Sequence, residues 1–168
     1  YGDVIPGFTQ PLAGSVGGYL KNQGVYKCPA DLSTWPKSGA NAVPRVRSCS
    51  MNCYMGTTKW ESENPNEIAP GYFIFRKFSI FPAGLGPADA MTIVDENPLS
   101  INDGFLLISE PSGGNDHPAV NHGQSSTITS ADGHAMLHKW RDALLTNPAG
   151  STGSDFAWLA AHVSIKIQ

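Results

Sequence analysis

Five histidines offer imidazole nitrogens that could bind a metal or move a proton: His117, His122, His134, His138 and His162. His134 and His138 are four residues apart, so on a helix they would share a face and could both bind zinc. On a strand the same spacing covers about 13 Å, which is too far for one ion. Because Asp132-Gly133 directly precedes His134, we expect a turn and a strand here, and no zinc site.

Two short acidic segments form a second candidate for metal binding, Asp95-Glu96-Asn97 and Asn102-Asp103. Carboxylate and amide oxygens are the ligands that calcium takes from loops. Calcium at Asp95 and Asp103 is therefore the candidate cofactor. The alternative is that Asn102 and Asp103 form a plain turn before the next strand, with the acids solvated.

The three cysteines, Cys28, Cys49 and Cys53, lack the paired spacing of a zinc site. We interpret them as small buried side chains. The alternative is one disulfide between Cys28 and either Cys49 or Cys53.

Trp35 and Trp60 lie in loop-like sequence, where exposed aromatic rings could form a platform for sugars. Packing in a core or interface is the alternative. The chain has neither a Gly-x-Ser-x-Gly motif nor a phosphate-binding loop of the Walker type, and no local motif indicates a Ser-His-Asp triad. We therefore predict that the protein is not an enzyme.

The composition indicates what kind of fold positions these residues. The chain of 168 residues has 18 glycines, 13 prolines and only 15% charged residues. Frequent turns favour a loop-rich α+β or β domain over a helical bundle, and the length fits a single domain over residues 1–168. The net charge is −3 without a basic stripe, which argues against nucleic acid binding. No run approaches the ~20 apolar residues of a membrane span, so we expect either that the chain is cytosolic or that its targeting segment, and any membrane contact, lies upstream of Tyr1.

The clearest local element is a hairpin around Asp132-Gly133, a dipeptide typical of a two-residue type I′ turn. This turn would place Ile128 beside Leu137 and would point Asp132 into solvent. His122 would lie near the far end of the hairpin, about 25 Å away at ordinary strand rise. We therefore predict that His122 and Asp132 belong to a folding unit and do not form an acid–base pair.

Shorter patterns predict the other elements. Alternating or apolar runs indicate strands, and the run after Ser154 indicates a helix capped by that serine. The predicted segments are a helix at 15–21, an extended piece at 25–28, strands at 45–55, 90–94 and 104–108, a strand or aromatic-rich loop at 72–81, the helix at 155–161 and a final strand at 163–167.

Three segments, taken in order, resemble one known family. His122 is separated by nine residues from Asp132-Gly133, as in the His-x9-Asp-Gly signature of prepilin-type processing-associated domains. Cys28-Pro29-Ala30-Asp31 resembles the family's Cys-Pro-x-Asp segment, whose matching residues are Cys28, Pro29 and Asp31. The run from Arg45 to Asn52 resembles its Arg-Ser-x-Ser-Met-Asn strand. On these segments the chain is similar to the heads of pilin- and pseudopilin-like proteins, which implies an α+β head with an antiparallel β-sheet, long loops and short helices.

The resemblance implies a non-catalytic structural subunit of a type II secretion pseudopilus or of a type IV pilus-like surface filament. Its head would lie in the cell envelope or at the cell surface, on the periplasmic or extracellular side. The partners would be other pilin or pseudopilin subunits, held through an N-terminal apolar helix that the 168 residues do not contain. We therefore expect the chain alone to be monomeric.

Some pseudopilin heads are stabilised by calcium, so the resemblance also favours the calcium candidate at Asp95 and Asp103. Two other classes of function stay open. One is a carbohydrate-binding module that uses Trp35 and Trp60, and the other is a metal-dependent hydrolase.

Overall fold

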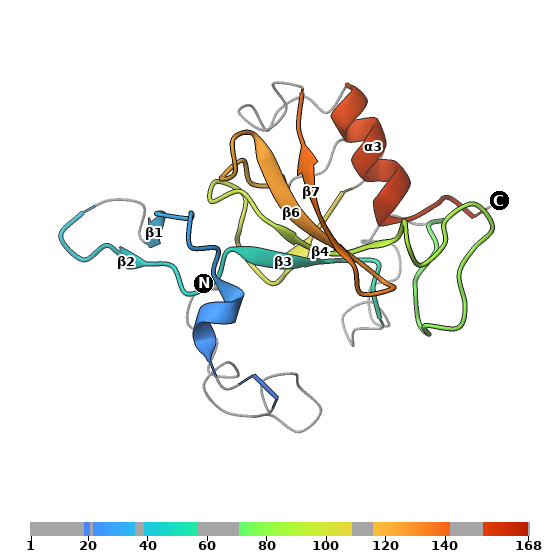
Figure 1. The fold of residues 1–168 in the computed structure, drawn as a ribbon, viewed down its shortest axis with the longest axis horizontal. Helices are drawn as coiled ribbons and strands as arrows, with labels where there is room; N and C mark the ends of the chain where they lie inside the picture. The colour runs from blue at the N-terminus through green and yellow to red at the C-terminus, as the bar shows by residue number, and fades with distance from the viewer. Residues whose placement is uncertain are drawn as a thin grey trace.

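The computed structural model describes residues 19–20, 22–35, 39–56, 71–108, 116–141 and 153–167, which form a five-stranded sheet, a two-stranded sheet and an α-helix (Figure 1). The order in the larger sheet is β5-β3-β4-β6-β7, and only β3 and β5 run parallel. The mixed α and β content and the mainly antiparallel sheet agree with the sequence prediction. The elements are η2 Gln23–Tyr26, β1 Thr34–Trp35, β2 Val43–Pro44, β3 Cys49–Asn52, β4 Met91–Asp95, β5 Phe105–Leu106, β6 Ser125–Ser130, β7 Ala135–Lys139 and α3 Ser154–Val163.

The core lies between one face of the larger sheet and α3. Val94 of β4 pairs with Ile128 of β6, and both side chains are almost completely buried. Phe156 and Leu159 of α3 belong to the same apolar cluster, as does Trp140 after β7. Successive strand residues point to opposite faces, so this packing decides which side chains of β4 and β6 point away from the core.

Asn52, the last residue of β3, is fully buried and ties the sheet to the end of α3. Its side-chain amide donates to the backbone oxygens of Met91, at 2.8 Å, and Val163, at 2.7 Å. Its side-chain oxygen accepts the backbone N–H of Tyr54 at 3.0 Å. A buried amide with partners for both donors and for its oxygen stabilises this junction without an unpaired polar atom.

The predicted β6–β7 hairpin is confirmed, but its turn differs from the prediction. Gly133 has a φ of 93°, and Asp132 is not among the residues with positive φ. The backbone oxygen of Ser130 accepts from Gly133, and the N–H of Ser130 donates to His134. This is a three-residue loop ending in a left-handed glycine, not a two-residue type I′ turn.

The longer loop shifts the pairing of the two strands by one residue. Ile128 faces Met136, whereas Leu137 faces Thr127 and is 62% exposed. The predicted contact between Ile128 and Leu137 was therefore wrong, because a one-residue change in register moves a side chain to the other face.

Several other boundaries also differ. The piece expected to be extended at 25–28 overlaps the 3-10 helix η2, because the Asn22 side chain accepts the N–H of Gly24 and starts a turn.

Ser154 does not cap α3 but begins it, after Gly153. The strands expected at 45–55 and 104–108 shorten to β3 and β5. The segment 72–81 and the tail at 163–167 form no named strand, but they meet at an isolated bridge between Tyr72 and Lys166, and the N–H of Phe73 donates to the oxygen of Ile165. The helix expected at 15–21 lies outside the described residues, apart from Tyr19 and Leu20, which are not helical.

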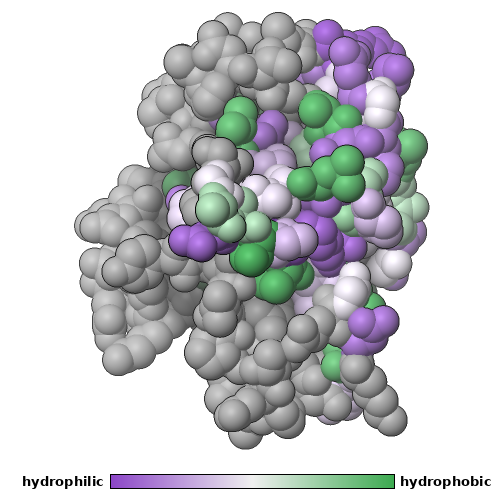
Figure 2. Space-filling model, turned by 90° about the vertical axis from the view of Figure 1, so that its left-hand side faces the viewer, coloured by the Kyte–Doolittle hydropathy of each residue, from purple (hydrophilic) through white to green (hydrophobic). Residues whose placement is uncertain are grey.

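The face of the sheet opposite the core carries partly exposed apolar side chains. Met51 pairs with Ile93, and they are 37% and 43% exposed, with Leu137 on the same face. Figure 2 shows hydrophobic residues interspersed with hydrophilic ones on one side of the molecule. Among the described residues, no helix is long and apolar enough to cross a membrane.

Candidate functional site

Asp95 ends β4 and points away from the core, because its neighbour Val94 points into it. Its carboxylate is nonetheless largely shielded, and Oδ2 accepts the backbone N–H of Thr127 at 3.2 Å. This bond between neighbouring strands holds the carboxylate at the end of the sheet.

His122 reaches this carboxylate from the sharp turn that precedes β6. Gly123 and Gln124 both have left-handed backbone conformations, with φ values of 62° and 63°. The N–H of His122 donates to the oxygen of Ser125, which closes the turn. Glycine adopts this conformation freely, so only Gln124 carries a conformational cost, and the turn directs the imidazole of His122 towards β4. The imidazole remains 34% exposed, and its Nε2 is 3.7 Å from Oδ2 of Asp95.

Cys28 arrives from a third part of the chain, just after η2. Its N–H donates to Oγ of Ser48 at 2.7 Å, and the N–H of Ser48 donates to the oxygen of Tyr26 at 2.9 Å. These two bonds fix the Cys28 segment against the residues that lead into β3. The Cys28 sulfur lies 3.2 Å from Nε2 of His122, although the two residues are 94 positions apart.

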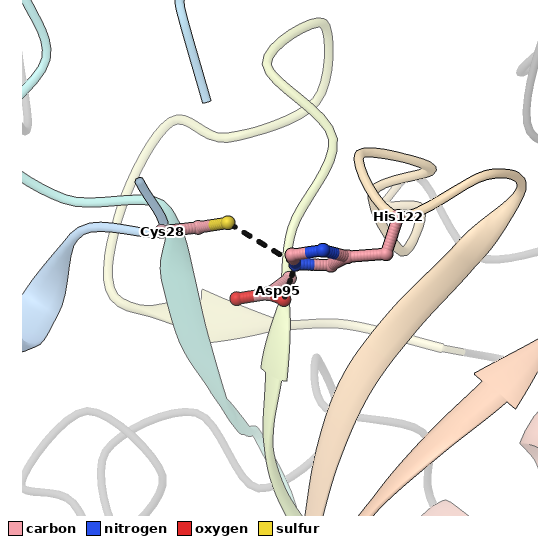
Figure 3. Close-up of side chains that lie close together, drawn as sticks. All are labelled: Cys28, Asp95 and His122. Atoms are coloured by element: carbon pink, nitrogen blue, oxygen red, sulfur yellow. Dashed lines mark hydrogen bonds and ion pairs between the residues drawn. The ribbon is translucent and has the colours of Figure 1, made fainter. Parts of the chain in front are cut away.

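Cys28, Asp95 and His122 therefore converge on one point (Figure 3). Their sulfur, oxygen and nitrogen atoms all lie within 4.8 Å of one another. Within the part of the chain that the structure describes, this is the group of three His, Cys, Asp or Glu side chains close enough to share a metal ion. Each of the three residues was a candidate in a different motif of the sequence, and no local pattern connects them.

The geometry does not match a nucleophile–base–carboxylate triad. In such a triad the base uses one ring nitrogen for the nucleophile and the other for the orienting carboxylate. Here Cys28 and Asp95 both approach Nε2 of His122. The arrangement can share one proton among three groups, or it can hold a cation, and it offers no oriented base.

The acidic segment that begins at Asp95 divides between two environments. Glu96 points to the interior, where it is 1% exposed and accepts hydrogen bonds from the hydroxyls of Ser50 and Ser100. Burial raises the pKa of Glu96 to about 8, with the Ser50 hydrogen bond opposing the shift and Asp116 adding to it. Glu96 is therefore largely protonated at neutral pH and belongs to the interior.

Asp103, the other predicted calcium ligand, has a different role from Asp95. Its carboxylate accepts the N–H of Phe105 at 2.8 Å, which starts β5. It does not join Asp95 in the group of candidate ligands that the described residues form. This arrangement fits the alternative of a turn before the strand.

Asp132 and His122 have different partners, as predicted. Asp132 is exposed, and its Oδ1 accepts the N–H of His134 at 3.1 Å and lies 2.7 Å from the His134 ring. The backbone hydrogen bond from His134 is the main cause that lowers the pKa of Asp132. His138 stacks on Trp158 with ring centroids 3.8 Å apart, and it lies within strand β7, four residues after His134.

The remaining predicted residues have structural surroundings. Asp31 is buried and accepts the N–H of Ser33 at 2.8 Å, while Pro29 is exposed. Trp35 is 43% exposed, with the Arg45 guanidinium 5.2 Å from its ring centre. Trp60 lies outside the described residues.

All three cysteines are free thiols, so the alternative of a disulfide is not realised. Cys53 is buried, as expected, whereas Cys28 and Cys49 are only partly buried. The Cys49 thiol donates to the Tyr26 oxygen at 3.4 Å.

Comparisons of the chain with family models, with curated proteins and with solved structures found no match in any of the three.

Proposed function

We propose that the chain is the globular head of a pilin- or pseudopilin-like subunit, which contributes to a secretion pseudopilus or a surface filament without catalysing a reaction. The head would act in the cell envelope or at the cell surface, and its partners would be other subunits of the same assembly.

The observation that carries this proposal is the meeting of the three segments on which the family resemblance depends. The N–H of Cys28 donates to the hydroxyl of Ser48, which lies in the run from Arg45 to Asn52. The sulfur of Cys28 contacts His122, the first residue of the His-x9-Asp-Gly signature. The other end of that signature, Asp132-Gly133, forms the β6–β7 turn. Residues that build one folding unit from distant segments are expected to recur together in a family of structural domains.

Two further features support an assembly role over a triad hydrolase or a sugar-binding platform. The cluster at His122 lacks the oriented base of a nucleophile–base–carboxylate triad, and the ring of Trp35 already contacts the Arg45 guanidinium. The sheet face with Met51, Ile93 and Leu137 leaves apolar side chains partly exposed, as a domain that packs against other segments requires.

Cell fractionation tests the proposal. An antibody raised against this chain should detect the protein in the envelope fraction and in filaments sheared from the cell surface. Crosslinking in intact cells should give a ladder of adducts with pilin-like subunits. Detection only in the cytosol, as a monomer without such adducts, would contradict the proposed function.

A further inference from the structure

We propose that Cys28, Asp95 and His122 form a zinc site, with a water molecule as the fourth ligand. This inference rests on the local geometry and holds whether or not the chain is a pilin-like head.

The distances fit a tetrahedral ion. Ordinary bonds of zinc to sulfur, nitrogen and oxygen, about 2.3, 2.0–2.1 and 2.0–2.2 Å long, place sulfur and nitrogen about 3.5 Å apart and nitrogen and oxygen about 3.4 Å apart. The Cys28 sulfur is 3.2 Å from Nε2 of His122, and that nitrogen is 3.7 Å from Oδ2 of Asp95. Both of these separations differ from the tetrahedral value by less than about 0.4 Å, which a small side-chain rotation can supply. The sulfur and the carboxylate oxygen lie within 4.8 Å of each other.

The ligand types also select zinc. A thiolate, an imidazole and a carboxylate together suit a borderline-soft ion, whereas calcium and magnesium prefer oxygen ligands alone. Without a metal, Nε2 of His122 offers either one N–H or one lone pair, so it can form a well-directed hydrogen bond with only one of the sulfur and the carboxylate. With a metal, all three groups direct lone pairs to one centre.

The surroundings of the ligands are those of a supported site. The N–H of Thr127 bonds to the Asp95 carboxylate, and the Cys28 backbone is held by Ser48. Such outer contacts orient ligands and raise metal affinity. The His122 side chain is one-third exposed, so solvent can reach the fourth position. Three protein ligands and one water is the open type of zinc coordination.

The test is metal titration of the untagged full chain after removal of metals with a chelator. Zinc alone should bind with a stoichiometry of one ion per chain in competition with a chromophoric chelator. Cobalt(II), used as a spectroscopic probe, should give the near-ultraviolet charge-transfer band of a thiolate ligand. Zinc at 100 times its Kd should raise the Tm by roughly 5–10 °C.

Matched variants locate the site. Cys28→Ser should abolish the charge-transfer band. Cys28→Ser and His122→Ala should each weaken zinc binding by more than about 100-fold, because 100-fold is the largest loss of affinity usually seen when only an outer-shell partner of a ligand is removed. Asp95→Asn should also weaken binding, and it keeps an acceptor for Thr127, so it tests the site in a folded chain. Cys49→Ser and Asp103→Asn are the controls and should bind zinc like the unmodified chain.

Three results would overturn the proposal. One is the absence of stoichiometric zinc binding by the full chain. Another is equal loss of binding in the control and site variants, which would indicate adventitious surface binding. The third is retention of the charge-transfer band in Cys28→Ser with normal far-ultraviolet circular dichroism.

Discussion

The buried carboxyl group of Glu96 should make the protein less stable as the pH rises. In the unfolded chain this group loses its proton near pH 4.5, whereas in the folded protein burial raises its pKa to about 8. Folding therefore takes up a proton between these two values. The free energy of unfolding must fall as the pH rises from about 4.5 to about 8, and the contribution is lost above that range.

The magnitude follows from the two pKa values. At about 1.36 kcal/mol for each pH unit, the difference between 4.5 and about 8 corresponds to about 5 kcal/mol. A typical domain is stable by only about 5–15 kcal/mol, so the effect is large. Glu96→Gln removes the titration and keeps a polar side chain of similar shape for Ser50 and Ser100, whose hydroxyls can donate or accept.

Urea unfolding between about pH 5 and pH 9 is the measurement. The unmodified chain should lose several kcal/mol more than Glu96→Gln over this range, and the variant should be the more stable protein at pH 9. Asp116, whose pKa burial raises to about 6, acts with the same sign at lower pH, and Asp116→Asn should flatten only that part. Burial lowers the pKa of His117, which makes stability rise with pH and opposes both effects. An unchanged pH dependence in Glu96→Gln would refute the reasoning.

Three further predictions concern stability and assembly. Asn52→Leu removes three buried hydrogen bonds and should lower the free energy of unfolding, measured in urea, by at least about 3 kcal/mol. The same change at exposed Asn102 should alter the free energy of unfolding by no more than about 0.5 kcal/mol. Similar values for both variants would contradict the role of Asn52. Gly133→Val should lower stability in thermal melts by about 1–2 kcal/mol or more, because φ at Gly133 is 93°. An added Cβ meets no atom within 4 Å, so the cost comes from the backbone conformation alone. Asp132→Asn should be nearly neutral in the same measurement, and equal losses in the two variants would argue against the turn. Light scattering should show the 168-residue chain as a monomer, and a stable large oligomer would contradict this expectation.

Local patterns in the sequence predicted the elements whose causes are local. The β6–β7 hairpin follows from Asp132-Gly133, and β4 follows from the apolar run that includes Val94. The predicted turn type was wrong because an Asp-Gly dipeptide occurs in both two-residue and three-residue hairpin loops, and tertiary contacts decide which loop forms. Here the N–H of Ala131 donates to the backbone oxygen of Ala90, and the N–H of Asp132 donates to the backbone oxygen of Pro87.

The candidate site could not be predicted from local patterns. Cys28, Asp95 and His122 meet because β3, β4 and β6 lie side by side in the sheet, and no short motif specifies that order. The different environments of Asp95 and Glu96 also depend on where β4 ends. The predicted strand ended at residue 94. If it had been extended to Asp95, the alternation of side chains would have predicted that this carboxylate points away from the core, opposite to Val94.

The N-terminal sequence of the native protein, together with the gene sequence upstream of Tyr1, tests the proposed function most directly. The proposal predicts a short basic leader, then Gly-Phe-Thr-Leu-x-Glu or a close variant, and an apolar helix of about 20 residues leading into this chain. Mass spectrometry of the native protein should show that the leader is removed and the helix retained. A native chain in which a glycosidase domain precedes Tyr1, with no leader and no apolar helix, would contradict the assignment to pilin-like subunits.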